Sequence, residues 1–215
     1  MFPAVLLITS LFLTASAQTT GVATAVAQKQ GLKAGDKAPD FQLKGVDGQT
    51  YGLQQIAASG KDVKGFIVVF TCNTCPFAQR YESRIIELHN KMTPKGYPVV
   101  AIQPNDPALI PGDSYANMQK RASEKQYPFV YLFDEGQEVF PQYGAERTPT
   151  VYLLDKNLTV RYTGAIDDNA NDAAAAKRRY VEEAIAAIEA KKEVATKETK
   201  SIGCGIKSRK IDRTN

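Results

Sequence analysis

The chain has 215 residues, of which 43% are hydrophobic and 23% are charged, and this composition excludes a disordered, collagen-like or disulfide-dense protein. The formal net charge is +4, and the basic excess falls after Ala190, so the body is nearly neutral and no nucleic-acid partner is expected. Three cysteines and one histidine leave few ligands for a metal.

The N-terminal segment is typical of a secretory signal. An apolar run over 4–13 precedes the small residues Ala15-Ser16-Ala17, which fit a cleavage site. We therefore expect a signal peptide over 1–17 and an exported protein, periplasmic or extracellular. No basic residue precedes the run, so a buried N-terminal helix or an anchor is the alternative. No apolar run reaches the ~18 residues of a spanning helix, so we expect no integral membrane segment in the mature chain.

Strands and helices alternate along the rest of the chain. The predicted elements are a hairpin of 41–44 and 50–53, a strand 66–70, a helix 77–92, a strand 98–102, a polar helix 113–125, a strand 129–133, a short helix 135–143, a strand pair 150–154 and 158–162, and a helix from 172. Wholly apolar runs indicate strands buried on both faces, and apolar residues at helical spacing indicate helices.

This order of elements predicts an α/β fold in one domain over 35–190. A central mixed β-sheet would have helices on both faces, with an N-terminal β-hairpin added to it. We expect a flexible lead-in over 18–34 and a mobile, basic C-terminal tail over 191–215.

The chemistry is expected where a buried strand becomes a helix. Cys72 and Cys75 stand three residues apart at that point, and Pro76 opens the helix. Positions i and i+3 share a helix face, so the sulfurs can form a disulfide, and the unpaired N–H groups of a helix start stabilise a thiolate. We expect Cys72, as the more exposed sulfur, to have the lowered pKa and to attack a substrate disulfide, and Cys75 to resolve the mixed disulfide.

Other interpretations of the pair are a structural disulfide or two inert core cysteines. A zinc site needs about four ligands, and only His89 and Cys204 remain as further soft donors. His89 falls late in the predicted helix, where we expect a surface or packing residue. No metal is therefore expected, and no cofactor beyond the dithiol itself.

Three stretches together resemble the thioredoxin superfamily. They are residues 70–76, 143–154 and 160–164. The resemblance implies a thioredoxin-like fold over most of the mature chain, with Cys72 and Cys75 as the redox pair. It implies a cis peptide bond before Pro149, although a trans bond is the default from sequence alone. It also implies that Thr148 and Pro149 bind substrate, the backbone of Thr148 pairing with a bound peptide.

Further residues resemble a peroxiredoxin-like branch of that superfamily, related to redoxins and thiol-specific antioxidant proteins. They are Asn105-Asp106, Asp113-Ser114, Phe133-Asp134-Glu135 and Gly203-Cys204-Gly205-Ile206-Lys207. Peroxiredoxins use a T-x-x-C motif whose cysteine matches Cys75, but Cys72 here replaces the Thr. Their peroxide-polarising Arg would fall near Pro149, and Arg147 is close to that position without matching it. The dithiol therefore looks intact and the peroxide pocket incomplete.

Cys204 lies between two glycines in the basic tail. One interpretation makes it an additional resolving thiol that folds back onto the Cys72–Cys75 pair. It is otherwise a free or intermolecular thiol, or a tail residue with no redox part. The sequence leaves these interpretations open.

The sequence favours an exported thiol–disulfide oxidoreductase that uses a C-x-x-C dithiol at a helix N-terminus and exchanges electrons with the cysteines of partner proteins. A peroxiredoxin-like thiol peroxidase that reduces hydroperoxides is one alternative. A non-catalytic binding module with a thioredoxin fold is the other. The Asn73-Thr74 dipeptide between the cysteines does not indicate the direction of electron flow.

Overall fold

The computed structural model describes residues 31–59 and 62–209, so the predicted signal peptide and most of the lead-in lie outside it. The strands are β1 (Leu43–Gly45), β2 (Thr50–Tyr51), β3 (Gly65–Phe70), β4 (Val99–Gln103), β5 (Val130–Phe133), β6 (Arg147–Thr148), β7 (Thr150–Asp155), β8 (Val160–Gly164) and β9 (Cys204–Gly205). The α-helices are α1 (Leu53–Ser59), α2 (Pro76–Met92), α3 (Tyr115–Glu124), α4 (Val139–Tyr143) and α5 (Tyr180–Glu189).

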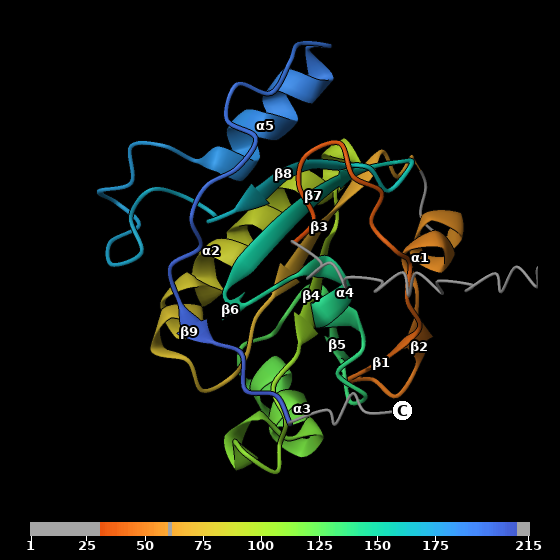
Figure 1. The fold of residues 1–215 in the computed structure, drawn as a ribbon, viewed down its shortest axis with the longest axis vertical. Coiled ribbons are helices and arrows are strands. Elements are labelled where there is room, and N and C mark those ends of the chain that lie inside the picture. The colour runs from red at the N-terminus through yellow and green to blue at the C-terminus, as the bar shows by residue number, and fades with distance from the viewer. Residues whose placement is uncertain (1–30, 60–61, 210–215) are drawn as a thin grey trace, which may run out of the picture.

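Seven strands form one mixed sheet in the order β2-β1-β5-β4-β3-β7-β8 (Figure 1). The three central strands β5, β4 and β3 run parallel, while β7 is antiparallel to β3 and β8 to β7. The hairpin of β1 and β2 extends the same sheet through β5. The mixed sheet and the N-terminal hairpin are thus confirmed.

Helices cover both faces of the sheet because β3 is apolar on both sides. Ile67 and Val69 pack into a cluster with α2, α3 and α5. Their neighbours Phe66, Val68 and Phe70 pack on the opposite face with α1 and α4. All six residues of β3 are buried, so this strand, which leads into the cysteine pair, is anchored from two sides.

Two helices differ from the prediction because side-chain carboxylates accept backbone N–H groups near the predicted or observed starts. The carboxylate of Asp40 accepts the backbone N–H groups of Leu53 and Gln54, and this distant cap starts α1, which the sequence did not predict. Helix α5 begins at Tyr180 and not at Asp172, because Asp172 accepts a nearby backbone N–H and holds a turn there.

Residues 197–209 of the predicted tail lie against the domain, where the sequence suggested a mobile segment, and residues 210–215 lie outside the described part of the chain. We call residues 197–209 the strap. Its first part pairs with Thr163 of β8, and β9 then pairs with β6 (Figure 1). At its end, the Arg209 guanidinium lies 3.1 Å from the Asp106 carboxylate, so part of the basic charge is used in docking.

No helix in the described part of the chain is both long and apolar enough to cross a membrane.

The loop between β8 and α5 is held by a buried ion pair that offers a stability test. Arg84 on α2 contacts Asp167 at 2.6 Å, and both side chains are almost fully buried. Replacing Asp167 with Ala leaves a buried cation without its anion, so we expect a loss of about 3–5 kcal/mol in the free energy of unfolding.

Urea unfolding of Asp167→Ala measures this loss. Glu124→Ala is the control, since its pair with Lys120 is exposed and its removal should cost less than ~1 kcal/mol. Equal losses in the two variants would contradict a stabilising role for the buried pair.

Candidate functional site

The two predicted redox cysteines lie at the junction of β3 and α2. Cys75 is the N-cap residue of α2, and Pro76 occupies the first helical position, where a missing N–H costs nothing. Both thiols are free, and the residues are only 5% and 3% exposed for Cys72 and Cys75. The expected difference in exposure is therefore absent.

Thr148 brings the cysteine pair together with the predicted substrate-binding residues. Its hydroxyl oxygen lies 3.2 Å from the sulfur of Cys72, and its carbonyl oxygen lies 3.3 Å from that of Cys75. Thr148 is fully buried, and the Thr148–Pro149 peptide bond is cis. Two motifs far apart in the sequence thus form one site.

Cys204 joins the same site from the C-terminal strap. In the antiparallel pair of β6 and β9, Cys204 stands directly opposite Thr148. It packs against a small cluster formed by Cys72, Cys75 and Ala78. All three cysteines of the chain therefore lie together beside Thr148. This is the arrangement that a C-terminal thiol folding back onto the pair would need.

The hydrogen bond between the two active-site thiols separates their pKa values. Donation from the Cys72 thiol is the main cause that lowers the pKa of Cys75; burial opposes it, and a contact with Cys204 lowers it further. The same bond raises the pKa of Cys72, and burial and the charge of Asp113 add to the rise. Burial, followed by contact with Cys75, raises the pKa of Cys204 to about 11.

These shifts favour a thiolate at Cys75, whereas the sequence predicted it at Cys72. Cys75 is the middle sulfur of three, so it receives donors from both sides, whereas Cys72 is the donor in their shared bond. The N-cap position of Cys75 also places it nearest to the positive end of the helix dipole. The pKa shifts and the helix position therefore both favour a negative charge on Cys75.

A buried carboxylate fixes the loop between the cysteines. One oxygen of Asp113 accepts the backbone N–H groups of Asn73 and Thr74, at 2.9 and 3.0 Å, and the other accepts the Thr74 hydroxyl at 3.0 Å. Asp113 itself is fully buried. Sequence reasoning assigned it no role, because an acidic residue beside Ser114 is also what a helix start would contain.

Asn105 connects this loop to the strap. Its amide nitrogen donates to Asp113 at 2.7 Å, and its amide oxygen accepts the backbone N–H of Lys207 at 2.8 Å. Gln137 also donates to the carbonyl of Lys207, at 3.0 Å. Asn105 and Asp113, whose only signal in the sequence was a family resemblance, thus link the C-x-x-C loop to the strap.

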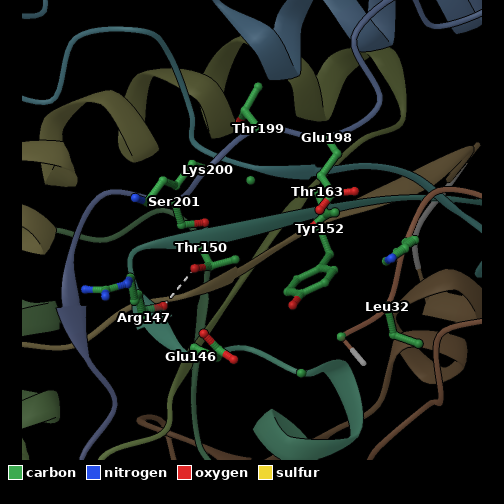
Figure 2. Close-up of a pocket in the computed structure, with 14 residues that line it drawn as sticks. Leu32, Glu146, Arg147, Thr150, Tyr152, Thr163, Glu198, Thr199, Lys200 and Ser201 are labelled. Carbon is green, nitrogen blue, oxygen red and sulfur yellow. Dashed lines mark hydrogen bonds between the residues drawn. The ribbon is translucent and has the colours of Figure 1, made fainter. Parts of the chain in front are cut away.

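A pocket opens beside the site where the strap crosses β7 and β8. Figure 2 shows Glu198, Thr199, Lys200 and Ser201 of the strap on one side and the β6 and β7 residues on the other. Arg147 holds the strap here, because its guanidinium donates to the carbonyl of Gly203 at 2.9 Å. This contact gives Arg147 a docking role in place of peroxide binding.

The single histidine is half-buried and packs beside the core, within the prediction of a surface or packing residue. Its ring lies 5.8 Å from that of Phe129, and its Nδ1 atom accepts the backbone N–H of Val99 at 3.3 Å. Burial lowers the pKa of His89. Among the residues that the structure describes, no cluster of three or more His, Cys, Asp or Glu side chains could hold a metal.

Comparison with known proteins places the site in a family. Residues 34–163 match the family described as AhpC/TSA. The chain belongs to the AhpC/TSA family. Its membership agrees with the resemblance to the thioredoxin superfamily and its redoxin branch, which is confirmed.

Relatives of this AhpC/TSA protein include both enzymes and uncharacterised proteins. The thiol-disulfide oxidoreductase ResA of Geobacillus thermodenitrificans is 26% identical over 151 residues, covering 70% of this chain and 80% of that protein. An uncharacterised conserved protein of Geobacillus kaustophilus is 37% identical with a TM-score of 0.76, covering 82% and 93% of the two chains. A putative thiol:disulfide interchange protein DsbE of Chlorobium tepidum is 25% identical with a TM-score of 0.57, covering 73% and 98%.

The position of the negative charge can be tested by thiolate absorbance in the ultraviolet. An ordinary cysteine has a pKa of about 8.5, so a lowered pKa at Cys75 predicts one thiolate that persists well below pH 8.5 in the reduced protein. Cys72→Ala removes the main donor to Cys75 and should move this titration to higher pH. Cys204→Ala should move it in the same direction by less.

A Cys75→Ala variant locates the charge directly. It should lose the thiolate seen at low pH. A thiolate that survived Cys75→Ala with an unchanged pKa, but disappeared in Cys72→Ala, would assign the charge to Cys72.

Proposed function

We propose that this AhpC/TSA protein is a thiol–disulfide oxidoreductase whose redox pair is Cys72 and Cys75. The observation that supports this most directly is the pair of free thiols at a helix N-terminus, each of which contacts Thr148, the residue before Pro149. The relatives named thiol-disulfide oxidoreductase ResA support the same class of reaction. No further cofactor is needed, because the two thiols supply both electrons.

The charge distribution suggests the order of steps. The Cys75 thiolate attacks one sulfur of a partner disulfide, which forms a mixed disulfide and releases the partner's other sulfur as a thiolate that takes up a proton. Cys72 then loses its proton and attacks the sulfur of Cys75. The Cys72–Cys75 disulfide forms and the second partner thiol leaves, so two electrons have passed to the partner. The reverse sequence oxidises a partner dithiol.

Thr148 and Pro149 are the proposed substrate-binding residues. Thr148 touches both sulfurs, so an extended chain paired with its backbone would have a cysteine within reach of them. Strand β6 already pairs with another chain segment in this manner, namely β9. The partner class is thus a protein whose cysteine lies in an exposed, extended stretch.

A hydroperoxide is the second candidate substrate. The specific observation in its favour is the lowered pKa of Cys75, the sulfur that matches the reactive cysteine of peroxiredoxins. A Cys75 thiolate would be oxidised to sulfenic acid, and Cys72 would displace water from it to form the disulfide. Against it, the guanidinium of Arg147 is engaged with the strap.

Single cysteine variants test the exchange function. With insulin as the disulfide substrate and dithiothreitol as the reductant, we expect the native protein to accelerate reduction, and Cys72→Ser and Cys75→Ser to fall to the uncatalysed rate. Cys72→Ser combined with Cys204→Ser should trap the substrate on Cys75, because the attacking sulfur remains and no other thiol is left to resolve the mixed disulfide. Mass spectrometry of the trapped adduct identifies the bonded cysteine.

Cys204→Ser tests whether removal of any one cysteine is enough to abolish the reaction. This variant should still form the mixed disulfide. Trapping only in Cys75→Ser would restore the order of attack expected from the sequence. Rapid consumption of hydrogen peroxide without reaction with insulin would instead favour the peroxidase, and inert thiols would leave a binding module.

Export is a separate part of the proposal, supported by the apolar run over 4–13 and the small residues that follow it. Expression of the full chain in a bacterial host should give a protein outside the cytoplasm. Mass spectrometry of its N-terminus should show a start near Gln18. An intact N-terminus in the cytoplasmic fraction would contradict export.

A further inference from the structure

The strap is docked at several points along its length. Thr199 pairs with Thr163 through its backbone, and its hydroxyl accepts the backbone N–H of Ala165 at 2.9 Å. Further on, the backbone N–H of Ile206 donates to the carbonyl of Glu146 at 2.9 Å. These contacts lie on either side of Cys204, so its position is fixed by the fold.

Glycine at position 203 allows the backbone of the strap to lie against the backbone of Thr148. A Cβ atom at Gly203 would lie 2.0 Å from the carbonyl oxygen of Thr148, which no side chain can tolerate. At Gly205, two residues further, a Cβ atom would meet no heavy atom within 4 Å. The strap therefore needs a glycine immediately before Cys204 to reach the site, and this need is specific to one of the two glycines.

We propose that Cys204 is a third redox thiol of this site, which forms a disulfide with Cys75 while β9 is paired with β6. The strap then occupies the place of a bound substrate, with Cys204 as a built-in substrate sulfur opposite Thr148. The inference rests on the proposed dithiol function and adds a partner for Cys75 within the chain. It differs from a simple second resolving thiol because it assigns Cys75, which Cys204 contacts in the docked strap, as the sulfur that Cys204 bonds to.

The step is an isomerisation of the oxidised site. The Cys204 thiolate attacks the Cys75 sulfur of the Cys72–Cys75 disulfide. The Cys75–Cys204 bond forms and the Cys72–Cys75 bond breaks, and Cys72 leaves with the electron pair and takes up the proton that Cys204 gave away. No net oxidation occurs, and the oxidant that made the first disulfide is the partner disulfide of the proposed reaction.

The isomerisation moves the disulfide to a more accessible sulfur. Cys204 is half-buried, whereas Cys72 and Cys75 are buried. A thiol of a reducing partner can therefore attack Cys204 and displace Cys75. The lowered pKa of Cys75 makes it a good leaving group. A reducing partner that contacts the strap would thus return Cys75 to the thiolate while Cys72 and Cys75 stay buried.

Disulfide mapping tests the proposal on the full chain. Trypsin cleaves after Lys64 and Arg80 and after Lys200 and Lys207, so Cys72 and Cys75 share one peptide and Cys204 lies in another. After oxidation with a small disulfide and alkylation of the free thiols, a Cys75–Cys204 bond joins the two peptides, whereas a Cys72–Cys75 bond does not. We expect Cys72→Ser to give the joined peptides, and Cys75→Ser to give them at least about tenfold more slowly, because only a docked, aligned thiol gains a high effective concentration.

The two glycines supply a matched pair of controls in the Cys72→Ser background. Gly203→Ala should slow formation of the joined peptides at least about tenfold, because its Cβ atom forces β9 away from Thr148. Gly205→Ala should form them at the rate of the parent. Circular dichroism and urea unfolding establish that both variants retain the folded domain.

The proposal is overturned if folded Cys72→Ser yields no joined peptides, if Cys75→Ser forms them equally fast, or if both glycine variants behave alike. The proposed function has its own readout, which is insulin reduction by the native protein and by Cys204→Ser. Insulin reduction without joined peptides would reject the third thiol and retain the dithiol enzyme. Absence of both would reject the two proposals together.

Discussion

The arrangement of the site depends on the contacts of one buried threonine. Thr148 touches Cys72 through its hydroxyl and Cys75 through its carbonyl, and its backbone pairs with the strand that holds Cys204. Its own position is set by β7, which follows directly and is paired with β3 along its whole length. Since β3 leads into the cysteine pair, the sheet itself brings Thr148 and the sulfurs together. The geometry of the site is therefore as rigid as the centre of the core.

A second constraint keeps the C-x-x-C loop in place and couples it to the chain terminus. Asp113 fixes the loop through the backbone of Asn73 and Thr74, and Asn105 bridges Asp113 to the strap. Buried polar groups of this kind are costly unless every partner is present. Undocking of the strap removes one partner of Asn105, so the state of the strap and the conformation of the loop are energetically linked.

Prediction from the sequence was most successful where the spacing of apolar residues was enough to identify a strand or a helix. The apolar run of β3 and the helical spacing of α2 located the cysteine pair correctly, and the mixed sheet followed from the order of elements. It failed where the deciding partner was distant in the chain, as with Asp40 and the start of α1. The docked strap is the clearest case, because β9 has only two residues and no pattern of its own.

The pKa shifts favour a different ionised sulfur from the one that the sequence predicted. Helix position alone favours a lowered pKa at the cysteine that begins the motif, but a pKa also depends on which neighbours donate. The contact between the two thiols is the largest cause of the difference in pKa, and Cys204, which reaches Cys75 only in the folded protein, adds to it. The C-x-x-C motif by itself gives no information on the contact between Cys204 and Cys75.

Docking of the strap imposes a condition on any substrate that uses the same edge. Strand β6 offers one pairing edge beside the sulfurs, and β9 occupies it as part of the same chain, at an effective concentration that a separate peptide must exceed. A separate peptide can therefore displace β9 from the edge of β6 only if it also binds other parts of the protein surface. Ile202 of the strap, next to Gly203, is 48% exposed. A partner that binds the strap would both loosen β9 and approach Cys204, so recognition and electron transfer would begin at the same segment.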